Sequence, residues 1–372
     1  MSPMVNETIV WSDMLSTEQQ LVLILLPSLS FLIIITLLRC IWKTQSSKPT
    51  FSLPLAVSLP SYGSTSSSMY LCQEGDVAGD YARSWRRSFD FVFFLVMLAY
   101  LIVLLSLTVW LEPMYLVMPW FWMWQIPQVC IMMLVSLVGG LICRSCCAVN
   151  TKGYIITNKA STFKVNYTRK LQHFAAFTVP LLFNSYDNSL LALAWGDFYI
   201  LLCFLLLIKP FRESSKFLML QFNSFDRPED RPHTLKWIVA GNIAPGMLLI
   251  IFFQCLIESD LVYLIIFITA IGDGLAEPIG IRYGQHKYET HGCFSARLYV
   301  RSWEGSACIF LTAMALPAMQ YADFDNFNQV VAAMLILPPT MAYAEAVAPH
   351  TIDTPILMST CGMVLYLIQF YI

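Results

Sequence analysis

Apolar residues along this chain are gathered into long runs, and polar residues are confined to the stretches between them. The runs at 91–111 and 237–257, for example, contain no charged side chain and reach the ~20 residues that an α-helix needs to cross about 30 Å of hydrocarbon. The pattern predicts about ten transmembrane helices, at 21–42, 91–111, 120–143, 171–185, 188–208, 237–257, 261–279, 305–321, 328–349 and 355–372.

The same pattern excludes a membrane β-barrel. Barrel strands are segments of ~10 residues in which apolar and polar positions alternate, and the sequence contains no such segments. The chain is 57% hydrophobic and 12% charged, far from the roughly 25% charged residues of soluble domains. We therefore expect an all-α polytopic membrane protein.

The charged residues fall into two unlike sets under this assignment. All 22 Lys and Arg residues lie on one side, in the loops at 39–87, 144–170, 209–236 and 282–301. The loops of the other side contain acidic residues and no basic ones. Because basic loops stay in the cytosol, we expect this side to be cytosolic and both termini to be non-cytosolic.

The chain divides into two parts. Residues 1–165 form an N-terminal extension of three helices with a long cytosolic loop at 43–89, which includes a Ser-rich piece at 64–68. Residues 166–372 form a membrane core that carries the candidate chemistry. The glycosylation sequon at Asn6 favours the endoplasmic reticulum, with a plastid or bacterial membrane as alternatives. We expect no nucleic-acid partner.

The stretch at 271–284 is the most unusual part of the core. It places Asp273 and Glu277 one helical turn apart in a segment that is otherwise apolar and glycine-rich. A charge deep in a bilayer costs on the order of 2.5 kcal/mol or more, so such residues usually face a polar cavity. Two carboxylates at this spacing can hold Mg²⁺ together with phosphate oxygens and water. The alternative is that they form structural ion pairs with Arg282 and Lys287, and that the glycines serve helix packing.

Basic and small residues follow this stretch on the same predicted side. Arg282, Lys287 and Arg301 would neutralise phosphate charge. Ser302 and Gly305 open a helix whose free backbone N–H groups suit an anion. The combination favours phosphoryl transfer, in which positioning and charge stabilisation do nearly all the work.

Further polar residues lie elsewhere in the core. Arg169 and His173 are four residues apart, so they share a helix face just inside the cytosolic boundary. Glu345 ends the ninth predicted helix, and Asp353 lies in the turn after it. Asp197 differs because it lies near the middle of the fifth helix, where it is either a polar packing partner or a wall of a lipid-hydroxyl pocket.

Taken together, these motifs resemble the signature of the phytol kinase, dolichol kinase and polyprenol kinase family. The resemblance covers residues 169–372, and Thr354 stands where the family usually has Asn. The motifs that carry it are Arg169-Lys170-Leu171-Gln172-His173, Gly272-Asp273-Gly274, Gly280, Gly284, Arg301-Ser302-Trp303-Glu304-Gly305-Ser306, Glu345 and Asp353.

The resemblance implies a membrane kinase that transfers the γ-phosphoryl group of CTP, or of another nucleoside triphosphate, to an isoprenoid alcohol such as phytol, farnesol or dolichol. The nucleotide would come from the cytosol, the lipid alcohol from the bilayer, and Mg²⁺ or another divalent cation would assist. The implied metal ligands are Asp273 and Glu277. The implied catalytic residues are Asp273, Glu345 and Asp353. The implied cofactor-binding residues are Gly272, Gly274, Gly280, Arg282, Gly284, Lys287, Arg301, Ser302, Gly305, Arg169, Lys170 and His173.

Three alternatives stay open at this point. Two are related enzymes: a CTP-dependent diacylglycerol kinase and a cytidylyltransferase that forms a CDP-lipid. The third is an ion-coupled transporter, in which Asp197, Asp273 and Glu277 would form a proton or cation path.

Overall fold

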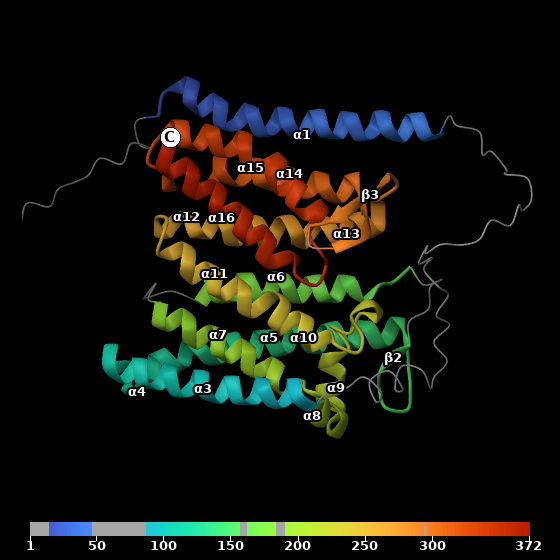
Figure 1. Cartoon of the computed structure of the whole chain (residues 1–372), viewed down its shortest axis with the longest axis vertical. Coiled ribbons are helices and arrows are strands. Elements are labelled where there is room, and N and C mark those ends of the chain that lie inside the picture. The colour runs from blue at the N-terminus through green and yellow to red at the C-terminus, as the bar shows by residue number, and fades with distance from the viewer. Residues whose placement is uncertain (1–14, 47–86, 157–161, 184–189, 294) are drawn as a thin grey trace, which may run out of the picture.

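The computed structural model describes residues 15–46, 87–156, 162–183, 190–293 and 295–372. The Ser-rich piece at 64–68 and the sequon at Asn6 lie outside these ranges. Long helices run back and forth along a common direction (Figure 1). They are α1 (Thr17–Ser46), α3 (Arg87–Leu111), α5 (Pro119–Cys146), α6 (Val165–Phe183), α7 (Leu190–Leu205), α11 (Ala244–Gln254), α12 (Ser259–Phe267), α13 (Gly274–Tyr283), α14 (Trp303–Met319), α15 (Phe327–Val347) and α16 (Asp353–Tyr371).

Seven helical segments in the described ranges are long and apolar enough to cross a membrane. Two of them join shorter elements end to end, because α10 (Thr234–Ile238) continues into α11 and α12 continues into α13. The architecture is therefore that of an all-α membrane protein, as the sequence predicted. The remaining short helices are α4 (Met114–Val117), α8 (Lys209–Ser214), α9 (Lys216–Phe222), η2 (Pro228–Asp230) and η5 (Tyr321–Asp323).

A wide π-helical turn interrupts each of the two joined helices. The turn η3 (Val239–Ile243) separates α10 from α11, and η4 (Ile268–Asp273) separates α12 from α13. Such turns are rare and occur often at functional sites. Here η4 ends on Asp273, one of the two acidic residues that the sequence analysis singled out.

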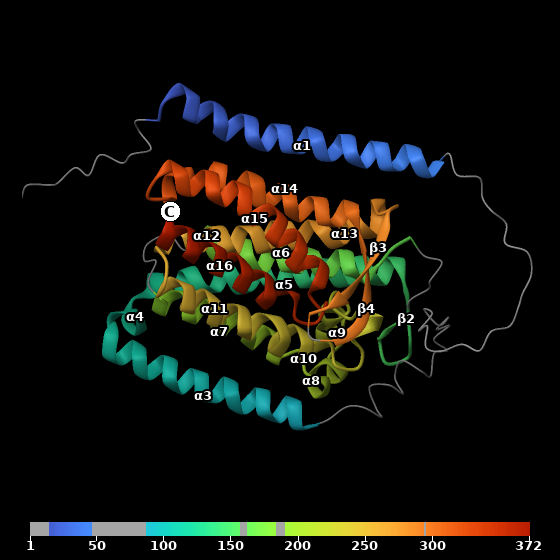
Figure 2. The same ribbon diagram turned by 45° about the horizontal axis from the view of Figure 1, so that its top comes forward.

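Two short antiparallel hairpins accompany the helices. In the first, β1 (Ala148–Val149) pairs with β2 (Ile155–Ile156). In the second, β3 (Lys287–Gly292) pairs with β4 (Ser295–Ser302), with Lys287 opposite Ser302. Both hairpins lie at the same end of the bundle as α8 and α9, whereas α4 and the C-terminus lie at the opposite end (Figures 1 and 2).

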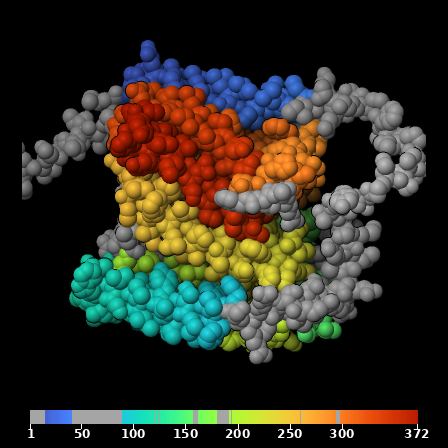
Figure 3. All heavy atoms as spheres, viewed as in Figure 1, coloured from blue at the N-terminus to red at the C-terminus, as the bar shows by residue number. Residues whose placement is uncertain are grey.

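The apolar interior consists of two large clusters. One joins α11, α12, α14, α15 and α16, with Leu264, Ile309, Met334 and Leu357 each fully buried. The other joins α3, α7, α9 and α10, with Leu104 and Phe222 near its centre. The first cluster also includes Leu23 of α1, which packs along α14. As a result, α1 and α3 lie on opposite flanks of the molecule (Figure 3).

The segment at 209–236, one of the basic loops of the sequence, is packed against the bundle. It forms the short helices α8 and α9 and folds back against the end of α5. Met219, Phe222 and Phe225 are buried. The segment therefore closes one end of the bundle, and this brings Asp226, Arg227 and Asp230 into the interior.

The contact between α5 and α9 gives a test of this closure. A Cβ atom at Gly140 would lie 1.9 Å from the backbone oxygen of Leu220, which no side-chain rotation can relieve. We expect Gly140→Ala to destabilise the protein by about 1–3 kcal/mol through overpacking. Thermal unfolding of the purified protein in detergent, followed by tryptophan fluorescence, measures the change. Gly196→Ala is the control, because its Cβ would meet nothing closer than the Gln128 Oε1 atom at 3.4 Å; equal melting temperatures for both variants would contradict the prediction.

Candidate functional site

One cavity of about 200 Å³ lies between the two apolar clusters. Its walls come from α5, α6, α7, α10, η3, α11, α12, α13 and α16. Most of its lining is apolar and extends along the length of the helices, through residues such as Ile200, Met247 and Ile266. One end is charged, and the polar residues there are Arg169, Lys170, His173, Arg227, Asn242, Asp273, Glu277, Asp353 and Thr354.

The central contact of the charged end joins α6 to η4. The Nζ atom of Lys170 lies 2.7 Å from Asp273 Oδ2 and 3.6 Å from Glu277 Oε2. Lys170 and Asp273 are 6% and 5% exposed, so both charges have left water. Such a pair is stable only because each charge compensates the other. His173, one turn after Lys170 on α6, places its Nε2 atom 3.7 Å from the same Asp273 oxygen.

Glu277 is held by two further donors. Its Oε1 atom accepts a hydrogen bond of 2.7 Å from Asn166 Nδ2 and one of 3.0 Å from Arg227 Nη1. Its other oxygen, Oε2, faces the Lys170 ammonium group at 3.6 Å. We conclude that Glu277 positions the cations around it.

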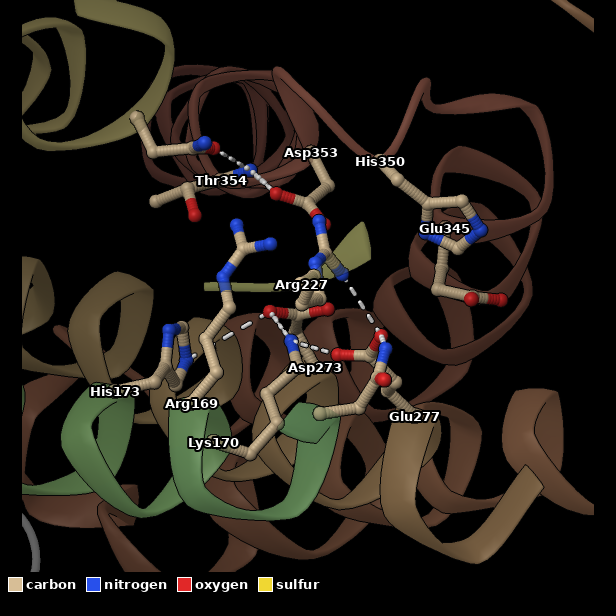
Figure 4. A network of polar contacts seen from close by, with 12 residues as sticks. Arg169, Lys170, His173, Arg227, Asp273, Glu277, Glu345, His350, Asp353 and Thr354 are labelled. Atoms are coloured by element: carbon tan, nitrogen blue, oxygen red, sulfur yellow. Dashed lines mark hydrogen bonds and ion pairs between the residues drawn. The ribbon is translucent and has the colours of Figure 1, made fainter. Parts of the chain in front are cut away.

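A buried arginine pair completes the positive charge of the site. Arg227 forms a two-pronged contact with Asp230, of 2.8 Å from Nε to Oδ2 and 3.1 Å from Nη2 to Oδ1. Arg169 Nη1 lies 2.7 Å from the same Oδ2 atom. Burial disfavours the charged form of Arg227, but Glu277 and Asp230 outweigh this effect and raise the pKa of the guanidinium. Arg169 and Arg227 both line the cavity, and a guanidinium keeps its charge in proteins, so both are cations of the site (Figure 4).

Asp353 differs from the other acids because it has no cationic partner at hydrogen-bond distance in the described part of the chain. Its Oδ1 atom accepts a hydrogen bond of 2.9 Å from the backbone N–H of Thr354. Asn242 of η3 fixes this turn by donating to Thr351 O at 3.0 Å and accepting from Thr354 N at 3.3 Å. Figure 4 shows the Asp353 side chain directed toward Arg227 and the interior of the site. One of its oxygens is thus available to a ligand.

A second polar group lies beside the cavity. Arg301 Nη1 lies 3.4 Å from Glu345 Oε1, and the same guanidinium donates to the backbone oxygens of Ala346 and Ala348. Ser306 donates to Glu345 Oε2 at 3.3 Å. Glu345 is near enough to the charged end to interact electrostatically with Asp273 and Lys170, but it does not line the cavity.

Arg301 also contacts the imidazole ring of His350. Its Nη1 atom lies 3.1 Å from His350 Nδ1. Burial, followed by the charge of Arg301, lowers the pKa of His350 to about 3. The ring is therefore neutral near pH 7, and Arg301 is committed to the turn between α15 and α16.

The motif glycines, which are Gly272, Gly274, Gly280, Gly284 and Gly305, allow close packing between helices. A Cβ atom at Gly274 would lie 2.6 Å from the Phe174 ring of α6, and one at Gly272 would lie 2.9 Å from Ile309 of α14. Gly280 and Gly284 would each meet Ser302 in the same way, and Gly305 would meet the Ala276 carbonyl. None of these five glycines lines the cavity. Gly274 in particular lets α6 come close enough for Lys170 to reach Asp273.

Three predicted phosphate contacts lie away from the cavity. Arg282 and Lys287 are exposed, near the end of α13 and at the start of β3. Ser302 is the N-cap of α14 and accepts a hydrogen bond of 3.1 Å from Gly305 N. The structure thus brings together Arg169, Lys170, His173, Asp273, Glu277 and Asp353 at one cavity, and leaves the other predicted residues beside it or outside it.

Sequence reasoning missed Arg227, Asp230, Asn242 and Asn166. Their nearest signal was composition: the segment at 226–231 contains five charged residues next to a buried phenylalanine. That signal does not by itself indicate burial, because burial of Arg227 depends on how 209–236 folds over the bundle. Asn242 was hidden in an apolar run that reads as an uninterrupted helix.

The charged end suits a divalent cation only when a phosphate is also present. In the described ranges, no group of three or more His, Cys, Asp and Glu side chains is placed to hold a metal ion. Mg²⁺ is usually bound by one or two carboxylates together with water and phosphate oxygens. Asp273, Glu277 and Asp353 all line the cavity, and Asp353 is the one of the three without a cation at hydrogen-bond distance in the described ranges.

Comparison of the chain with protein-family models, with curated proteins and with solved structures finds no match.

The Lys170 contact gives the second test. Removal of the lysine in Lys170→Met leaves the buried Asp273 carboxylate without its cation, which should destabilise the protein by about 3–5 kcal/mol. Neutralising the acid as well, in Lys170→Met with Asp273→Asn, should restore part of this loss because the two residues are coupled. Thermal unfolding in detergent measures both. Lys287→Met is the matched control at an exposed site; a double variant no more stable than the single one would contradict the assignment.

Proposed function

We propose that this protein is a membrane kinase that transfers the γ-phosphoryl group of CTP, or of another nucleoside triphosphate, to the hydroxyl of a lipid alcohol of isoprenoid type. One observation carries the proposal: a single cavity joins a group of buried cations to an apolar slot that runs along the helices. Cations at one end suit phosphate oxygens, and an apolar slot suits a hydrocarbon tail.

The membrane topology follows from the same arrangement. Ten crossings, as expected from the sequence, would require the shorter helices α6, α7 and α14 to cross the membrane beside the seven long segments. The end that bears both hairpins would face the cytosol, since the basic residues gather there. The C-terminus and the start of α1 lie at the other end (Figure 1). We propose the endoplasmic reticulum membrane as the location, with residues 1–165 as an extension of a catalytic core at 166–372.

The cations of the charged end would bind the triphosphate. Arg169 and Arg227 present planar guanidinium groups, which pair well with phosphate oxygens. Lys170 adds a point charge beside Asp273. On this proposal, phosphate oxygens take over part of the role that Asp230, Asp273 and Glu277 have in the structure described here. Arg301 and the motif glycines would act indirectly, by holding α13, α14 and the turn before α16 in place.

Asp353 would act as the general base. It lines the cavity and has an available oxygen, whereas Glu345 is outside the cavity and engaged by Arg301 and Ser306. In the reaction, the lipid hydroxyl loses its proton to Asp353 while its oxygen forms a bond to the γ-phosphorus. The bond from the γ-phosphorus to the bridging oxygen breaks, and CDP leaves. Mg²⁺ held by Asp273 together with phosphate oxygens would offset the negative charge of the triphosphate.

The decisive experiment uses the purified protein in lipid nanodiscs with Mg²⁺. We expect γ-labelled CTP to label at least one of phytol, farnesol, dolichol or diacylglycerol, and EDTA to abolish the reaction. α-Labelled CTP distinguishes a cytidylyltransferase, which would leave the label on the lipid and release pyrophosphate. If neither labelled CTP nor labelled ATP yields a labelled lipid, the result contradicts a kinase. Ion-coupled uptake into liposomes that is indifferent to nucleotide would favour a transporter.

The proposed base gives a more specific test. Asp353→Asn should lower kcat by about 10²–10⁴-fold, the usual contribution of a positioned general base. Its melting temperature should change little, because the amide can still accept the Thr354 hydrogen bond. Glu289→Gln, at an exposed position on β3, is the matched control. A larger loss of kcat in Glu345→Gln than in Asp353→Asn would indicate that Glu345, and not Asp353, is the general base.

A further inference from the structure

Asp197 is an acidic residue in the apolar part of the cavity that the proposed chemistry does not use. It lies near the middle of α7 and lines the cavity with Ile200 and Phe204. These residues are three and seven positions apart, so they form one stripe along the helix. Phe204 packs against Phe225, and Phe225 lies two residues before Arg227 in the sequence. Phe204 is therefore at the level of the charged end of the cavity. At 1.5 Å per residue, Asp197 lies roughly 10 Å further along the cavity.

The Asp197 carboxyl group has no hydrogen bond or ion pair with any described residue. Two neighbouring donors are already occupied. Tyr100, which interacts electrostatically with Asp197, donates its single hydroxyl proton to Ala194 O at 2.9 Å. Trp195 Nε1 donates to Thr108 Oγ1 at 3.0 Å. Because a polar group in an apolar site costs free energy unless it is hydrogen-bonded, a carboxyl group facing a cavity here indicates a ligand contact.

A second polar atom in the cavity also lacks a partner. Gln172 is 3% exposed and is among the residues that line the cavity. Its Oε1 atom accepts a hydrogen bond from Ser136 at 3.2 Å, but its Nε2 atom, which lies beside Gly139 of α5, is buried without an acceptor in the described part of the chain. A plain hydrocarbon tail would leave the Asp197 carboxyl group without a partner.

We propose that Asp197 binds a second hydroxyl group on the lipid alcohol, roughly 10 Å from the hydroxyl that is phosphorylated. A hydroxyl fits because it donates to a carboxylate and can also accept from a protonated carboxyl group. The inference rests on the proposed function for the reacting end of the lipid. It makes Asp197 a specificity-determining residue, and it makes the substrate a hydroxylated long-chain alcohol.

The test compares octadecan-1-ol with octadecanediols that carry the second hydroxyl at different positions along the chain. Two readouts are taken on the full-length protein in nanodiscs: kcat/KM for phosphorylation, and thermal stabilisation by the lipid without nucleotide. We expect the wild type to prefer a mid-chain diol over octadecan-1-ol by about tenfold, the usual effect of one hydrogen bond to a charged group. The preference should be largest at one chain position.

Variants of Asp197 decide the assignment. Asp197→Asn keeps a hydrogen-bonding group of the same shape and should retain part of the preference. Asp197→Leu should reduce the diol-to-alcohol ratio to about one. An equal diol-to-alcohol ratio in the wild type and in Asp197→Leu would overturn the proposal. It would indicate that Asp197 contacts water and no lipid hydroxyl. The absence of stabilisation by any member of the series would also overturn the proposal. If no lipid is phosphorylated but the binding preference persists and depends on Asp197, the proposed kinase function fails and the subsite stands.

Discussion

The structure depends on the ion pair between two buried side chains, Asp273 and Lys170. Asp273 lies at the end of a π-helical turn inside an apolar bundle, and Lys170 of α6 is the cation that compensates it. Separating these charges would leave each of them desolvated without a partner, so the pair fixes how α6 approaches α13. Gly274 allows the approach, and the Arg227 and Asp230 pair extends the same network to the segment that closes the bundle.

The cavity follows from this arrangement. The cavity lies between the two apolar clusters, and the charged network lines one of its ends. The slot between them is consequently polar at one end and apolar along the rest of its length. That polarity gradient matches an amphiphile, whose reactive head belongs with the cations and whose tail belongs with the aliphatic walls.

Much of this could be predicted from the sequence, and the rest could not for identifiable reasons. Uninterrupted apolar runs defined most helices, and the costly acids at 273, 277 and 353 identified the cavity. Arg227 and Asn242 were missed because their burial depends on tertiary folding rather than on local pattern. The motif glycines and Arg301 were taken for phosphate contacts, but a sequence does not distinguish a glycine that meets a ligand from one that meets a helix.

The two π-helical turns, η3 and η4, constrain the number of residues in the helices that they interrupt. A π turn accommodates one residue more than an α turn, and each residue rotates an α-helix by about 100°. The halves of the helix on either side of η4 can therefore face different neighbours: α12 faces the aliphatic cluster, while α13 presents Glu277 to the cations. Deleting one residue from η3 or η4 would turn one half against the other and move Asn242 or Asp273 away from the cavity. The number of residues in these turns thus constrains the protein as strictly as their identity.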